Sequence, residues 1–170
     1  IYVQAWYQGG ISVVDFTDSE NPFEIAYFDR GPVDEDQLIT GGYWSAYWYD
    51  GKIYGTEIAR GLDVFELEPS EFLSADEIAA AKQANYEDDR FNPQQQTEVT
   101  WDSDAVVAKA LADQLARSGA IPGSVAEQIK SRIDAGSIRI TMADLIEERA
   151  DTASEIDRSR IARLVDIIRT

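Results

Sequence analysis

Side chains that commonly carry catalysis are scarce in this chain. It contains no His and no Cys, which removes the commonest general base, thiol nucleophiles and the usual zinc ligands. A Ser-His-Asp triad is therefore impossible within the chain. Acid–base chemistry would have to use carboxylates, and the candidates are Asp29, Glu57 and Asp63. Because no spacing singles out a pair of them, the sequence predicts no catalytic residue.

A second group of carboxylates lies in the segment from Asp29 to Asp36, where Gly31-Pro32 indicates a loop. The side chains of Asp34, Glu35 and Asp36 could offer oxygen ligands to calcium. They lack the D-x-[DN]-x-[DN]-G spacing of a dedicated calcium loop, so a solvated turn is the favoured interpretation and a calcium site is the alternative. No other metal or cofactor is predicted.

The most aromatic segment is GGYWSAYWY, residues 41–49. Two-residue alternation in a strand would place Tyr43, Ser45, Tyr47 and Tyr49 on one face, with Trp44, Ala46 and Trp48 on the other. These rings could form a stacking platform for sugars or for another protein, or they could pack between sheets. Packing is the favoured interpretation. The candidate interaction residues are Tyr43, Trp44, Tyr47, Trp48 and Tyr49.

Several short strands must hold these side chains in place. Residues 11–16 and 23–28 read as strands around a polar turn that ends in Pro22. Asp50-Gly51 is a strong hairpin signal between the aromatic strand and a strand over residues 52–58. A further strand begins at Gly61, and Glu57 and Arg60 near the intervening turn could form an ion pair in a central channel.

One strand pattern occurs twice. Gly10-Ile-Ser-Val-Val-Asp-Phe and Gly61-Leu-Asp-Val-Phe-Glu-Leu share the order Gly, aliphatic, polar, Val, large apolar, acid, large apolar. The two glycines are 51 residues apart. This offset is close to the period of about 40–50 residues in β-propeller blades.

These residues carry a family resemblance. The pattern GxxVVDxxDxxNPxxIxYF from Gly10 to Phe28, followed by an aromatic strand and GLDVFEL, resembles the LVIVD-repeat family of bacterial β-propellers. The likeness covers roughly the first 70 residues, and the second copy departs from it at Glu68-Pro69-Ser70. It implies antiparallel β-propeller blades, the last one to two of a series, in residues 1–68. Because blades need neighbours, we expect the chain to be the C-terminal portion of a longer polypeptide. The alternative is a self-contained β-meander packed on helices.

The remainder of the chain predicts helices. Residues 69–86 are expected to form a connecting helix behind a capping box of Ser74 and Glu77. The polar residues 87–100 predict a linker, and residues 101–170 predict a small all-α bundle of four helices. The first two helices of the bundle are expected to begin behind Asp102/Ser103 and behind Ser124. On the last helix, Arg163 and Ile168 are further candidate interaction residues, and pairing of its arginines with neighbouring acids is the favoured interpretation of their charge.

Charge and hydropathy limit the classes of partner. The net charge is −17, and residues 1–100 carry 20 acidic against 5 basic side chains. Such a surface repels phosphate backbones, so nucleic acid is not an expected partner. No apolar run reaches the roughly 18 residues of a membrane helix.

These observations favour a non-enzymatic structural or interaction module. We expect it to be the C-terminal part of a secreted or cell-surface β-propeller that docks on partner proteins, either the remaining blades or another chain. One alternative is a subunit or fragment of a propeller enzyme whose site lies on absent blades. Another is a calcium- or carbohydrate-binding surface module.

Overall fold

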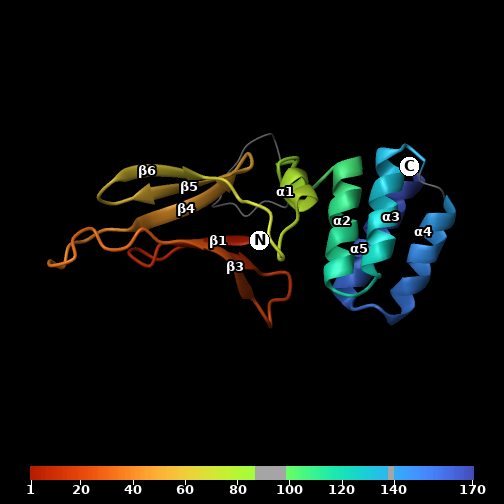
Figure 1. Ribbon diagram of the computed structural model, residues 1–170, viewed down its shortest axis with the longest axis horizontal. Helices are drawn as coiled ribbons and strands as arrows, with labels where there is room; N and C mark the ends of the chain where they lie inside the picture. Colours follow the sequence, from red (N-terminus) through yellow and green to blue (C-terminus); the bar gives the residue numbers. More distant parts are fainter. Residues whose placement is uncertain (87–98, 138–139) are drawn as a thin grey trace. The chain divides into compact units, whose positions relative to one another are not determined.

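The computed structural model describes residues 1–86, 99–137 and 140–170, which fall into a β unit and a helical unit (Figure 1). The β unit contains residues 1–68, and the helical unit contains the described residues from Pro69 onward. Each unit has a hydrophobic core of its own. The predicted linker over residues 87–100 lies almost entirely outside the described residues. At its end, Thr100 pairs with Asn85 in an antiparallel bridge.

Two antiparallel sheets of three strands each make up the β unit, and Figure 1 shows them as separate layers. The first sheet contains β1 (Tyr2–Ala5), β2 (Ile11–Asp15) and β3 (Phe23–Phe28) in that order. The second contains β4 (Tyr43–Tyr49), β5 (Lys52–Glu57) and β6 (Gly61–Phe65). Between β4 and β5, Asp50 and Gly51 both have positive φ, as the predicted Asp-Gly hairpin turn requires.

The two sheets pack face to face. Ile11 and Val13 of the first sheet are buried in one core with Tyr43 and Ile53 of the second. An isolated bridge between Tyr7 and Tyr43 also joins the β1–β2 turn to the start of β4. Gly42 makes this approach possible, because a Cβ at this residue would lie 2.0 Å from the backbone of Tyr7. Its φ of +83° is also one that glycine adopts readily.

The predicted fold class, antiparallel β-propeller blades followed by a small all-α domain, is wrong. The described residues form two three-stranded antiparallel sheets and five α-helices, a mixed α/β chain, and no closed ring of blades. The repeated pattern indicated strands correctly. The pattern did not determine how many strands each sheet would have. After β6 the described chain continues into helix α1 (Ala75–Ala81) and not into another strand.

The helical unit contains the remaining helices. These are α1, α2 (Ala105–Arg117), α3 (Gly123–Asp134), α4 (Ile140–Glu147), the short 3₁₀ helix η2 (Glu148–Thr152) and α5 (Glu155–Arg169). The core of this unit is made by apolar side chains spaced three and four residues apart on the longer helices. Its largest fully buried members are Leu115, Ile129, Ile146, Ile161 and Leu164.

Some helix starts follow the prediction and others do not. The capping box before α1 is confirmed, since Ser74 Oγ accepts from the Glu77 amide and the Glu77 carboxylate accepts from the Ser74 amide. In α2 the N-cap is Asp104, whose carboxylate accepts from the Val106 amide, rather than Asp102 or Ser103. In α3 the predicted cap Ser124 is wrong, because it already lies in the first turn.

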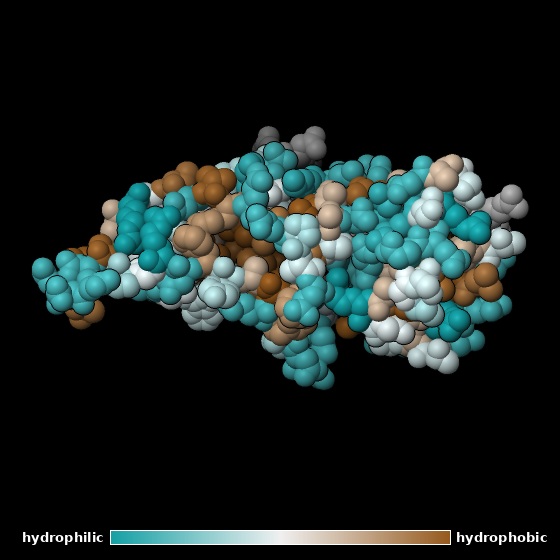
Figure 2. All heavy atoms as spheres, viewed as in Figure 1, coloured by the Kyte–Doolittle hydropathy of each residue, from teal (hydrophilic) through white to brown (hydrophobic). Residues whose placement is uncertain are grey.

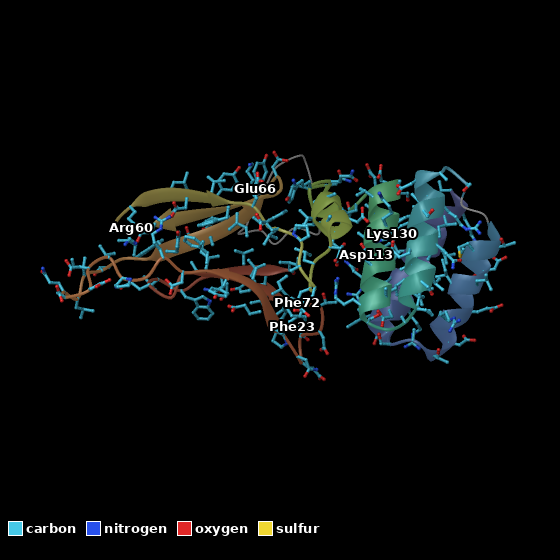
Figure 3. All side chains as sticks on the ribbon, in the orientation of Figure 1. Phe23, Arg60, Glu66, Phe72, Asp113 and Lys130 are labelled. Carbon is cyan, nitrogen blue, oxygen red and sulfur yellow. The ribbon has the colours of Figure 1, made fainter. Side chains whose placement is uncertain are left out.

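Ion pairs join α1 to α2 and α2 to α3, and the predicted connecting helix is an integral part of the helical unit. The buried Glu77 carboxylate accepts from the Arg117 guanidinium at 2.8 Å. Asp113 on α2 and Lys130 on α3 point toward each other (Figure 3), and Lys130 Nζ lies 2.7 Å from Asp113 Oδ1. The hydrogen bonds from Lys130 to Asp113 and to Glu127 raise the pKa of the Lys130 ammonium above its ordinary value.

Candidate interaction surface

The outer face of the β4–β5–β6 sheet is the face turned away from the core of the β unit. Strand pairing aligns its side chains in rows across the sheet. One row contains Tyr47, Tyr54 and Val64, and the next ends in Leu62 beyond Ser45 and Thr56. Leu62 is 61% exposed and Val64 is 49% exposed, and the Tyr47 ring is exposed beside them. An aliphatic and aromatic surface of this kind is typical of protein-binding faces.

The two hairpins of this sheet explain why these residues gather on one face. The Asp50-Gly51 turn sets the register of β4 against β5, which places Tyr47 directly opposite Tyr54. Ser45 Oγ and Thr56 Oγ1 lie 2.7 Å apart in the next row. Figure 2 shows hydrophobic residues reaching the surface over this part of the β unit.

A β-bulge changes the predicted arrangement of the aromatic strand. The pairing of β4 with β5 shifts register between Tyr43 and Ser45. Tyr43 therefore turns into the core and is 2% exposed, although simple alternation placed it on the face of Tyr47 and Tyr49. Trp48 packs against the same core, whereas Tyr47 and Tyr49 are exposed on the outer face. Trp44 is exposed, and its ring lies edge-on to the Tyr7 ring, with 5.9 Å between the ring centroids.

Behind the outer face, the Tyr43 hydroxyl belongs to a polar cluster. Tyr43 Oη donates to Asp63 Oδ2 at 2.6 Å, and Arg30 Nη2 donates to Asp63 Oδ1 at 2.9 Å. The hydrogen bond from Tyr43, followed by that from Arg30, lowers the pKa of the Asp63 carboxyl below its ordinary value. Burial, together with the bond to Asp63, raises the pKa of the Tyr43 phenol. The cluster therefore widens the pH range over which Asp63 is ionised and Tyr43 is protonated.

A second carboxylate organises the turn between β5 and β6. Glu57 is 4% exposed, and its carboxylate accepts from the amides of Gly42, Ala59 and Arg60. The ion pair with Arg60 is present, with 3.7 Å between Arg60 Nη1 and Glu57 Oε1, and it lies beside the turn between β5 and β6. Arg60, labelled in Figure 3, also donates to the Pro32 carbonyl at 3.1 Å. Both oxygens of Glu57 thus hold backbone in place.

The three candidate acid–base carboxylates therefore all bind neighbouring groups of the β unit. Asp63 binds Tyr43 and Arg30, Glu57 binds three backbone amides, and Asp29 accepts from the Gly31 amide at 2.8 Å. The sequence contained no signal for the role of Glu57, because its amide donors come from two separate segments of the chain.

The acidic loop forms a local turn. Asp34 Oδ1 accepts from the amides of Asp36 and Gln37 at 2.9 Å, while Glu35 and Asp36 are exposed. Among the residues that the structure describes, no three acidic side chains gather closely enough to hold a metal ion. Calcium binding by Asp34, Glu35 and Asp36 stays a prediction.

On α5, Arg163 and Ile168 have different surroundings. Arg163 pairs with Asp166 at 2.9 Å and donates to the Trp101 carbonyl at 2.8 Å. Ile168 is half-buried and packs against the core of the helical unit. Arg163 and Asp166 form an intrahelical ion pair, as the favoured interpretation of these arginines predicted. An interaction role for the two residues stays a prediction.

Sequence reasoning missed Leu62 and Val64, the most exposed aliphatic residues of the outer face. Their signal was present in the repeat, which aligns Leu62 with Ile11 and Val64 with Val13. The repeat by itself indicates strands and does not determine which of their faces is exposed.

Comparisons of the sequence with protein-family models, with curated proteins and with solved structures find no match. The resemblance to LVIVD repeats and the extracellular location therefore stay predictions. Within the described ranges, no helix is long and apolar enough to cross a membrane.

Proposed function

We propose that this chain is a non-enzymatic interaction module that docks on a partner protein through the outer face of the β4–β5–β6 sheet. The observation that carries the proposal is the exposure of Leu62 and Val64 beside Tyr47 on one regular sheet face. Burying such side chains gains about 25 cal/mol for each Å² of apolar surface removed from water. Tyrosine is also enriched at protein interfaces.

The surroundings of this face support docking rather than chemistry. The hydroxyl groups of Ser45 and Thr56 bind each other, and Lys52 forms an ion pair with Glu66 at the other end of the face. The carboxylates Glu57 and Asp63 lie on the opposite side of the sheet, where they bind backbone amides, Tyr43 and Arg30. The outer face is therefore an apolar surface between polar groups that already bind each other. The chain also contains no His or Cys.

Site-specific photo-cross-linking in the source cells tests the proposal. A photoreactive p-benzoylphenylalanine at position 64 should give a discrete protein adduct, and Leu62→Glu in the same chain should remove that adduct. The same group at position 38 is the matched control, because Leu38 is also an exposed aliphatic residue but lies in a loop. The proposal fails if position 64 gives no adduct, or if positions 38 and 64 give the same ones.

A further inference from the structure

The β1–β2 and β5–β6 hairpins are two copies of one structural unit. Adding 51 to the residue numbers of the first hairpin gives the strand pairs of the second. Val3↔Val13 becomes Tyr54↔Val64, and Ala5↔Ile11 becomes Thr56↔Leu62. All four pairs of the first hairpin follow this rule. The sequence repeat is therefore also a repeat of backbone register.

Each hairpin has two faces, and the two copies bury opposite ones. The Ile11-type face contains Val3, Ala5, Ile11 and Val13 in the first copy, and Tyr54, Thr56, Leu62 and Val64 in the second. The Phe65-type face contains Ile53, Gly55, Asp63 and Phe65 in the second copy, and Tyr2, Gln4, Ser12 and Val14 in the first. Within the β unit, the Ile11-type face of the first copy packs on the Phe65-type face of the second.

This packing is close and asymmetric. A Cβ added at Gly55 would lie 2.7 Å from Ile11 Cδ1, so the Ile11 side chain fills the space above this glycine. Next to it, the Phe28 ring of β3 lies 4.7 Å from the Phe65 ring, measured between centroids. Two different surfaces thus meet, as in a head-to-tail contact.

Each molecule also has an outer face at the equivalent positions of each hairpin, where Gln4 and Val14 of the first copy take the places of Gly55 and Phe65. The Ile11-type face of the second copy is the outer face with Leu62 and Val64. The Phe65-type face of the first copy is the outer face of the β1–β2–β3 sheet, where Tyr2 is exposed and Tyr27 of β3 is 75% exposed. Ser12 pairs with Tyr27, which places both residues on this same face.

We infer that the partner of the outer face is a second copy of this chain. The β4–β5–β6 face of one molecule stacks on the β1–β2–β3 outer face of the next, with Leu62 and Val64 on one side and Tyr2 and Tyr27 on the other. This inference rests on the proposed function and adds the identity of the partner. Because every molecule has both faces, the contact repeats from copy to copy and gives a ring or an open chain.

Charge gives the contact a distinctive salt dependence. Two copies with a net charge of −17 repel each other, and salt screens that repulsion. Self-association through apolar faces should therefore strengthen as ionic strength rises. Docking on a basic protein would instead weaken as ionic strength rises, because salt screens attraction between opposite charges.

Sedimentation equilibrium of the full chain tests the inference. We expect the wild-type mass to rise with protein concentration and with salt. Leu62→Glu/Val64→Glu blocks one face and Tyr27→Glu blocks the other, so each variant alone should stay monomeric. A mixture of the two variants should form a species of two chains and grow no further, because only one complementary pair of faces remains. Leu38→Glu is the matched control and should associate like wild type.

Two results would overturn the inference. One is a wild-type chain that stays monomeric at every concentration and salt level. The other is Tyr27→Glu that associates as well as wild type, which would indicate a symmetric contact of the Leu62 face with itself. In the first case the proposed function still stands if the adduct from position 64 contains a different protein, and it fails if there is no adduct.

Discussion

Val13 and Val64 occupy the same position of two hairpins with identical register, yet Val13 is 3% exposed and Val64 is 49% exposed. The difference arises because the sheet of Val13 is covered on that side by the second sheet, whereas the sheet of Val64 is not covered on the equivalent side by any described strand of the β unit. The two valines thus have the same local backbone pairing but differ in how far their side chains are buried.

Shortening these two valines should have unequal effects. Val13→Ala should lower the free energy of unfolding by about 1–3 kcal/mol, because it leaves a cavity between the sheets. Val64→Ala at low protein concentration should change it by less than about 0.5 kcal/mol. Urea denaturation followed by tryptophan fluorescence reports mainly on the β unit, which contains Trp6, Trp44 and Trp48, while Trp101 belongs to the helical unit. Equal losses for both variants would contradict the burial described above.

A methyl group at Gly55 should disturb the contact between the sheets. Gly55→Ala would place its Cβ 2.7 Å from Ile11 Cδ1 and 2.9 Å from the Tyr43 ring. We expect a loss of about 1–3 kcal/mol from overpacking. Adding Ile11→Val should recover part of that loss, since it removes the methyl group that Gly55 accommodates. A strictly additive double variant would show that the two positions do not touch.

Replacing the Glu57 carboxylate should weaken the β5–β6 turn. Glu57→Gln retains the size of the side chain but removes the charge that three backbone amides and Arg60 share. The expected cost is about 1–3 kcal/mol, as for other buried hydrogen bonds to charged groups. Glu35→Gln, an exposed acid in a loop, is the control and should behave like wild type. Denaturation of both variants at neutral pH gives the comparison.

Asp63 should make the β unit sensitive to acid. Its folded pKa is lowered by Tyr43 and Arg30, so the carboxylate stabilises the fold above the ordinary Asp pKa of about 3.9. That contribution is lost as the pH falls below this value toward the folded pKa. Asp63→Asn should therefore be less stable than wild type at neutral pH, and it should lose less further stability below pH about 4. Parallel acid profiles of denaturation midpoints would show that Asp63 does not contribute.

Removing a helix N-cap should destabilise the helical unit at the cap that the structure shows, and not at the cap that the sequence pattern predicted. Asp104→Ala removes the side-chain acceptor of the Val106 amide and should cost about 0.5–2 kcal/mol. Ser124→Ala should change stability by less than about 0.5 kcal/mol, because Ser124 is not the N-cap of α3. Thermal unfolding followed by far-ultraviolet circular dichroism measures the helices. A larger loss of stability for Ser124→Ala than for Asp104→Ala would indicate that Ser124 does cap α3.

The local elements of this protein follow from its sequence alone. Alternating side chains predicted the strands, Asp50-Gly51 predicted its turn, Ser74 and Glu77 predicted their capping box, and the 51-residue repeat predicted two strands of the same pattern. These features depend on backbone conformation and on bonds between residues close in the chain, so a local pattern is sufficient to determine them.

Only the tertiary structure decided which surfaces are covered. A bulge turned Tyr43 toward the core, amides from two separate segments met at Glu57, and the second sheet covered Val13 while its own outer face left Val64 exposed. Such outcomes depend on contacts between residues far apart in sequence. Two identical patterns can therefore have opposite environments, because burial is a property of the surfaces that meet and not of the strand that carries the side chain.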